Sequence, residues 1–194
     1  IITCDCGISN ALEFEHATGK NIDVIVTDHH TIPEKLPAAF AILHPKVVGE
    51  TYPDHTLSGG GVAFKLMQGL LQHPETKKLL PAGINPDGFQ KWQLDLVAIS
   101  SVADMVPLTG ETRTLVHFGC KVLGKTKRPG LRALLARDKI MITDWGSTTP
   151  ITPQTIGFKI APRINAAGRM DHGIHAFDML LAETPAEGVR LAEL

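Results

Sequence analysis

The chain has 194 residues, a formal net charge of −1 and a hydrophobic share of 43%. These values predict a soluble, globular protein with one ordinary domain or two small ones. No apolar run approaches the roughly 18 residues of a membrane helix, and no secretory signal is visible, so we expect a cytoplasmic protein without a membrane partner. The odd number of cysteines indicates reduced thiols: Cys4, Cys6 and Cys120.

The first third of the chain predicts a parallel strand–helix–strand unit. Residues 1–5 and 22–27 are short apolar, largely β-branched runs, as in buried parallel strands. A helix between them is expected to start at Asn10, which provides a cap, and to end near Gly19. A third strand is predicted over residues 39–43, closed by His44-Pro45.

After residue 58 the hydrophobic spacing becomes helical. We expect a helix from Gly59 to about His73, a loop over 81–88, and a helix from Trp92 to about Val106 that is apolar on most faces and therefore buried. Pro107 ends this last helix, which places Asp104 in its final turn. Only helices are predicted beyond residue 108: 112–124, 129–137, 153–160, 174–182 and 184 onward.

The predicted fold class is α/β, with part of a doubly wound parallel sheet followed by a mostly helical region. We place the α/β core in residues 1–108 and the helical region in residues 109–194. The chain begins inside an apparent strand and stops inside a helical pattern, so we expect it to be a fragment of a longer protein.

Acidic and imidazole side chains follow the predicted strands. Asp28, His29 and His30 leave the strand 22–27 together, and Asp5 ends the run 1–5. Ligand sites of open α/β sheets lie beyond the carboxyl ends of the strands. Asp104 is expected in a buried apolar helix, where a carboxylate costs free energy unless it is paired or binds a metal. Together these residues predict a site for Mn²⁺ or Mg²⁺. The alternatives are a helix cap for Asp5, loop histidines, and a solvent-reaching Asp104.

Two further segments are candidates for phosphate contacts. Ser58-Gly59-Gly60-Gly61 leads into a helix, where backbone N–H groups can face an anion, although a tight turn explains the glycines equally well. Arg163, Asn165 and Arg169 lie among small residues, and arginine suits phosphate; a helix-terminus ion pair is the alternative. His172 and His175 are three residues apart, but a glycine lies between them and weakens the pattern, so they are not assigned to a site.

Residues 111–139 contain eight basic and two acidic residues. A basic face of this kind can meet a phosphate backbone. A solvated helical surface is the alternative.

Four motifs together resemble the DHH phosphoesterase superfamily and, within it, the RecJ-type single-strand-specific 5′→3′ DNA exonucleases. They are Val26-Thr27-Asp28-His29-His30, Cys4-Asp5-Cys6-Gly7, the segment from Ser101 to Leu108, and the segment from Ala161 to Arg169. The triplet alone is typical of the superfamily, whereas the last two segments are more specific to RecJ-type enzymes. The resemblance covers essentially the whole chain.

The resemblance implies a two-metal Mn²⁺ or Mg²⁺ site with Asp5, His29 and Asp104 as ligands. It implies catalytic roles for Asp28, His29 and His30, and phosphate or DNA contacts for His30 and three residues of the last motif: Arg163, Asn165 and Arg169.

The resemblance also implies an Asp-x-Asp strand before residue 1 and a second domain after a long linker helix. Because both are missing, we expect this chain alone to be inactive. Single-stranded DNA is the implied substrate, with single-strand-binding protein and a helicase as further partners. Two alternatives stay open: a DHH hydrolase of small substrates (pyrophosphate, oligoribonucleotides or cyclic dinucleotides) and a non-catalytic DNA-binding replication scaffold.

Overall fold

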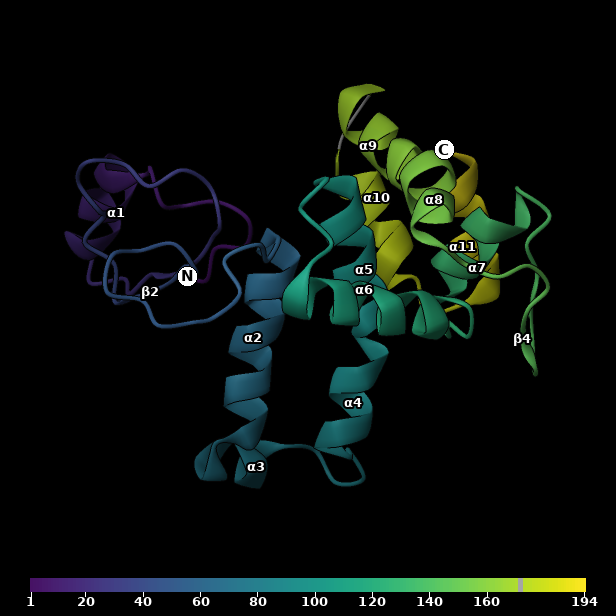
Figure 1. Cartoon of the computed structure of the whole chain (residues 1–194), viewed down its shortest axis with the longest axis horizontal. Helices are drawn as coiled ribbons and strands as arrows, with labels where there is room; N and C mark the ends of the chain where they lie inside the picture. Colours follow the sequence, from purple (N-terminus) through teal and green to yellow (C-terminus); the bar gives the residue numbers. More distant parts are fainter. Residues whose placement is uncertain (171–172) are drawn as a thin grey trace. The chain divides into compact units, whose positions relative to one another are not determined.

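A computed structural model of the chain describes residues 1–170 and 173–194, apart from the side chain of Met170. His172 lies outside the described residues. The chain divides into two compact units (Figure 1). Unit 1 contains residues 1–93 and 104–114, and unit 2 contains residues 94–103 and 115–194.

Unit 1 begins with the predicted parallel sheet. Strand β1 (Ile25–Thr27) pairs in parallel with β2 (Ala41–Leu43), with Val26 opposite Ile42. Residues 1–5 run along the other side of β1, where the N–H groups of Thr3 and Asp5 donate to the carbonyls of Ile25 and Thr27, each over 2.9 Å. The three predicted strands are therefore present, with β1 in the middle, although the regular ladders are shorter than expected.

One helix covers the buried face of this sheet. Helix α1 (Ala11–Thr18) follows Asn10 and stops just before Gly19, close to its predicted bounds, and it buries Phe14 and Ala17 against Val24 and Val26. The predicted cap was wrong, because the side chain of Asn10 makes no capping hydrogen bond. Val26 is completely buried, which explains why β-branched residues dominate this run.

Three further helices belong to unit 1. Helix α2 (Gly59–Gln72) is capped by Ser58, whose hydroxyl accepts from the N–H of Gly61. Helix α3 (Pro74–Leu79) and the loop after it connect α2 to α4 (Pro86–Trp92), as Figure 1 shows. The prediction of a loop over 81–88 was wrong at its end, because Asn85 caps α4 and Pro86 provides its first residue.

The remaining elements are mostly helical. Helix α5 spans Leu94–Ala103, and α6 (Gly110–Leu123) starts in unit 1 and continues in unit 2. The rest of unit 2 consists of α7 (Pro129–Ala136), strands β3 (Ile142–Thr143) and β4 (Gly146–Ser147), α8 (Pro153–Thr155), the π-helical turn η1 (Ile156–Ile160), α9 (Ala161–Met170), α10 (Gly173–Leu181) and α11 (Pro185–Glu193).

Two predictions for this region were wrong. The short antiparallel hairpin β3–β4 was not expected, because two-residue strands leave no alternating pattern; its turn uses Gly146 at φ 117°. The segment from Ala161 to Arg169 is helical, as α9, instead of lying beside a helix end. Among the described residues, none of the helices has the length and apolarity needed to cross a membrane.

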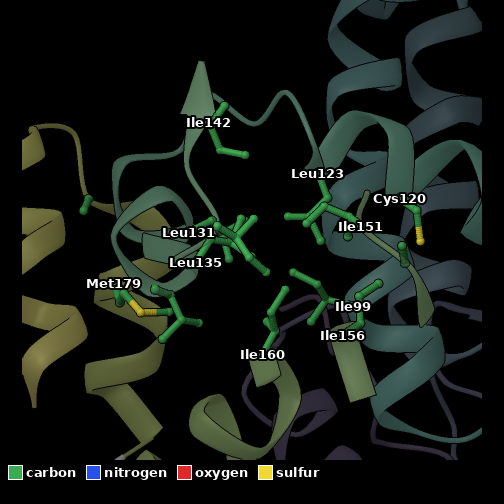
Figure 2. Packing of buried hydrophobic residues seen from close by; sticks show 14 of the residues in the cluster. Ile99, Cys120, Leu123, Leu131, Leu135, Ile142, Ile151, Ile156, Ile160 and Met179 are labelled. Atoms are coloured by element: carbon green, nitrogen blue, oxygen red, sulfur yellow. The ribbon is translucent and has the colours of Figure 1, made fainter. Parts of the chain in front are cut away.

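Aliphatic side chains from most of its helices form the core of unit 2. Figure 2 shows Leu131, Leu135, Ile156 and Ile160 pointing toward one another, and all four are at most 1% exposed. Helices α7 and α10 approach so closely that a Cβ atom on Gly130 would lie 1.9 Å from the carbonyl oxygen of Met179. Close packing therefore requires glycine at this position.

Candidate metal centre

The strand β1 delivers its polar residues to one edge of the sheet. Thr27, Asp28 and His29 are all buried at this end, and Thr27 also donates from its hydroxyl to the carbonyl of Thr3 over 2.7 Å. Asp5 ends the neighbouring extended segment in the left-handed region, with φ 62°. Few non-glycine residues adopt this conformation, and it is often found at functional sites.

Three predicted site residues lie close together at this edge. The Nε2 atom of His29 lies 3.0 Å from Oδ1 of Asp5 and 3.2 Å from Oδ2 of Asp104. The His29 ring is buried, whereas both carboxylates are partly open to solvent. Despite these distances, Nε2 makes no hydrogen bond to any described residue. Buried polar atoms normally have a hydrogen-bond partner. A buried imidazole nitrogen that lies between two carboxylates and lacks such a partner is in a suitable position to bind a cation together with them.

Asp104 reaches this point in a different way from the one predicted. Helix α5 ends at Ala103 rather than at about Val106, and Met105 turns the chain in the left-handed region at φ 54°. Asp104 is therefore an exposed residue just beyond the helix, not a carboxylate inside a buried apolar helix. The prediction that Asp104 lies inside a buried apolar helix was wrong, although its expected neighbours are correct.

Asp28 organises the triplet. Its Oδ1 accepts from the N–H groups of His29 (2.7 Å) and His30 (3.3 Å) and lies 2.7 Å from Nδ1 of His30, while Oδ2 accepts from the N–H of Ile8 at 2.9 Å. Burial raises the pKa of Asp28, but these hydrogen bonds outweigh it and hold the pKa below its ordinary value. The hydrogen bond that His30 donates to Asp28 in turn raises the pKa of His30.

His30 completes a group with the first two ligand candidates. One ligand atom from each of Asp5, His29 and His30 lies within 4.8 Å of the others. Because Nδ1 of His30 faces Asp28, the Nε2 side of this exposed ring can contact another partner.

Two residues that follow β2, for which the sequence predicted no role in the site, hold the backbone of His29 and His30. Burial lowers the pKa of His44, whose Nε2 lies 3.0 Å from the carbonyl oxygen of His30 and whose Nδ1 accepts from the N–H of Lys46. The Nζ of Lys46 donates to the carbonyl of His29 over 2.6 Å. The sequence could have predicted the position of His44, because this residue follows the predicted strand 39–43, and a neighbouring strand is followed by the triplet.

The glycine run before α2 lies against the same site. A Cβ atom on Gly59 would lie 2.2 Å from Oδ1 of Asp5, so only glycine allows the Asp5 carboxylate to approach the start of this helix. Ser58 is fully buried and caps the helix. Phosphate contacts of Ser58, Gly59 and Gly60 stay a prediction.

The other predicted phosphate-binding residues lie on α9 in unit 2. Both terminal nitrogens of Arg163 pair with the carboxylate of Asp138, and Nη2 lies 3.1 Å from Oδ1. Asn165 and Arg169 are exposed and four residues apart, so they share a face of the helix that Arg163 does not. The ion-pair alternative left open for Arg163 is therefore present in the structure, while Asn165 and Arg169 face outward.

The sequence of the first half of the chain agrees with this geometry. Residues 1–100 match the model of the DHH family, N-terminal domain. The chain belongs to the DHH family. The predicted resemblance at this level is thereby confirmed.

Within the DHH family, the chain is similar to RecJ proteins in particular. The chain is 40% identical over 192 residues to the single-stranded-DNA-specific exonuclease RecJ of Bacillus subtilis and 37% identical over 193 residues to RecJ of Escherichia coli. It also resembles the crystal structure of RecJ from Thermus thermophilus in complex with Mn²⁺, with a TM-score of 0.79 and 31% identity. These similarities confirm the predicted α/β fold and the resemblance to RecJ-type proteins.

The similarity covers this chain almost completely but only part of its relatives. It includes 99% of this chain in all three cases, against 22% of the Bacillus protein, 32% of the Escherichia protein and 26% of the Thermus chain. The chain thus spans about a fifth to a third of the length of these relatives.

Proposed function

We propose that this chain provides part of the catalytic site of a divalent-metal-dependent phosphodiesterase that degrades single-stranded DNA from its 5′ end. The observation that carries the proposal is the buried Nε2 of His29, which lies between Asp5 and Asp104 and has no hydrogen bond to a described residue. The relatives are named as single-stranded-DNA-specific exonucleases, and one was solved with Mn²⁺.

The residues present fit Mn²⁺ or Mg²⁺. Asp5, His29 and Asp104 offer two carboxylates and one imidazole, and no thiolate is needed, which suits hard or borderline cations. When bound, such ions supply Lewis acidity toward water and toward phosphate oxygens. The left-handed backbone of Asp5 and the glycine at position 59 hold one carboxylate in place before any ion arrives.

The other residues of the triplet act on the phosphate. Asp28 holds Nδ1 of His30 at 2.7 Å and so orients the ring. The Nε2–H of His30 would then donate a hydrogen bond to a phosphate oxygen, or give its proton to the leaving oxygen. The hydrogen bonds from His44 and Lys46 to backbone carbonyls fix His30 and His29 in these positions. Orientation of this kind accounts for a large part of catalysis when the reacting groups are held together.

The DNA strand is bound through its phosphates in this proposal. Asn165 and Arg169 provide one outward-facing pair on α9, and the basic residues between positions 111 and 139 provide further positive charge. Single-strand-binding protein and a helicase are proposed partners, and the cytoplasm is the proposed location.

The proposal is tested in the full-length protein that contains this chain. His29→Ala and Asp104→Ala are compared with His16→Ala and Asp23→Ala, which change exposed residues of the same unit. With 5′-labelled single-stranded DNA and saturating Mn²⁺, we expect the first pair to lose nucleotide release and the second pair to retain it. Wild-type turnover by either site variant would refute the assignment.

The same preparations separate the alternatives. A hydrolase of small substrates would cleave pyrophosphate or cyclic dinucleotides faster than single-stranded DNA. A scaffold would bind single-stranded DNA without releasing nucleotides at any Mn²⁺ concentration. Release that starts at the 3′ end would overturn the proposed direction.

A further inference from the structure

The carboxylate of Asp54 is buried in unit 1, outside the metal centre. It is 9% exposed and accepts hydrogen bonds from three groups. Its Oδ1 accepts from the N–H of Thr56 at 2.8 Å and from the Thr56 hydroxyl at 2.6 Å, and its Oδ2 accepts from the N–H of Thr112 at 2.8 Å. Burial raises the pKa of Asp54, but these bonds outweigh it and lower the pKa, so the group stays ionised at neutral pH.

Thr112 is in the first turn of α6, where N–H groups have no partner within the helix. The side chain that satisfies one of them usually comes from the residue just before the helix. Here it comes from Asp54, 58 positions away in the sequence. A carboxylate at this end is also favoured by the helix dipole.

A second contact holds the same turn. Glu111, beside Thr112, accepts from the hydroxyl of Tyr52 and from Nζ of Lys65, which also lies 2.9 Å from the side-chain oxygen of Gln68. The segment that runs from Tyr52 to Lys65 therefore binds the start of α6 through two adjacent residues.

The start of α6 is only six residues beyond Asp104, and the connection has little freedom. Met105 and Gly110 are both left-handed, with φ of 54° and 49°, and Pro107 fixes its own φ. The N–H of Thr109 donates to the carbonyl of Pro107 over 2.9 Å. Asp104 and the first turn of α6 are thus joined by a short connection with restricted backbone angles.

The same segment touches the other carboxylate of the centre. Gly59 lies within it and packs directly against Asp5. We propose that Asp54 is a positioning residue of the metal centre: by capping α6 from the segment that also packs on Asp5, it fixes Asp104 at its distance from His29. The inference rests on the proposed function, because it assumes that Asp104 binds the metal.

The test uses full-length protein and Mn²⁺ alone, with affinity measured by calorimetry and stability by thermal unfolding. Asp54→Ala is expected to weaken Mn²⁺ binding by about 10-fold, the lower end of the range seen when a hydrogen-bond partner of a metal ligand is lost, because Asp54 acts on Asp104 only through the start of α6. Asp54→Asn keeps one acceptor oxygen, so its loss of affinity is expected to be smaller. The matched control is Asn85→Ala, which removes the cap of α4 in the same unit and should leave the affinity unchanged.

Three outcomes are decisive. Weaker Mn²⁺ binding in the Asp54 variants, with unchanged binding in Asn85→Ala, supports the inference. Unchanged binding in Asp54→Asn and Asp54→Ala, or in Asp54→Asn alone if the alanine variant does not fold, overturns it and leaves Asp54 a helix cap only. Asp104→Ala is measured in parallel: if that variant binds Mn²⁺ like wild type, the proposed function fails first, whatever Asp54 does.

Discussion

Unit 1 and unit 2 bury different kinds of side chain. Most of the buried polar residues of the described chain belong to unit 1: Thr27, Asp28, His29, His44, Asp54, Ser58 and Thr112. Unit 2 is dominated by one aliphatic cluster that includes Leu131 and Ile156. Because buried polar groups must be hydrogen-bonded, the order of unit 1 depends on specific partners, whereas unit 2 depends on close packing. Substitutions in the two units should therefore fail in different ways.

The largest effect on stability is expected in the core of unit 2. Ile156 is fully buried, and Ile156→Ala leaves a cavity, so the free energy of unfolding should fall by about 2–5 kcal/mol. Mn²⁺ affinity should stay at the wild-type value. Urea unfolding and calorimetry check both quantities. A parallel loss of Mn²⁺ affinity at a temperature where the variant is folded would show that the two units do not differ as described.

The reverse pattern is expected for Gly59→Ala in unit 1. The new Cβ would overlap with Asp5, so Mn²⁺ affinity should fall by about 10-fold or more while stability changes little. Gly69→Ala in the same helix is the control, because a Cβ there meets nothing within 4 Å. It should leave affinity unchanged and stabilise by up to about 1 kcal/mol. Equal Mn²⁺ affinities for the two variants would contradict the close packing of Gly59 on Asp5.

The two arginines of α9 should respond differently to substitution, although both belong to unit 2. Arg169→Ala should weaken single-stranded DNA binding and reduce the log–log salt slope by about 0.7, as expected for one lost phosphate contact. Arg163→Ala also removes the ion pair with Asp138, so its melting temperature should fall more than that of Arg169→Ala. Filter binding at several salt concentrations, together with thermal unfolding, measures both. An unchanged salt slope for Arg169→Ala would remove this residue from the DNA site.

The smallest effect concerns pH. The hydrogen bond from Arg163 lowers the pKa of Asp138 in the folded state. The pair therefore stabilises the fold above the unfolded pKa of about 3.9, and this contribution is lost as the pH falls through the lower folded-state value. Asp138→Asn should lower stability at pH 7 by less than about 1 kcal/mol and flatten the loss of stability below pH 4. An identical pH profile for the variant and the wild type would contradict the pair's contribution.

The proximity of several candidate site residues was predictable, because ligand sites in parallel sheets lie beyond the carboxyl ends of the strands. Asp5 and His29 each end a short apolar run, and this pattern alone placed them at one edge. Asp104 was expected for the wrong reason, since the left-handed turn at Met105 that ends α5 has no sequence signal comparable to proline or glycine. The role of Asp54 was not predictable, because a cap supplied from 58 residues away depends on tertiary structure.

The fold was predictable where periodicity is long and strong. Helices α2 and α6 fall close to their predicted bounds, because their apolar residues repeat at helical spacing. Helix α9 was missed because its residues are mostly small or polar and contain Pro162, which fits here since η1 already supplies the preceding turns. The hairpin β3–β4 was too short to produce a pattern.

The most direct test of the account is anomalous diffraction at the manganese edge from crystals of the full-length protein grown with Mn²⁺. We expect a peak within bonding distance of Nε2 of His29 and of the carboxylates of Asp5 and Asp104. The peak should disappear in His29→Ala crystals, while the sheet edge keeps its shape. A manganese peak elsewhere, with Nε2 of His29 bonded to a protein group or a water molecule instead, would contradict the central claim that these three residues bind the catalytic metal.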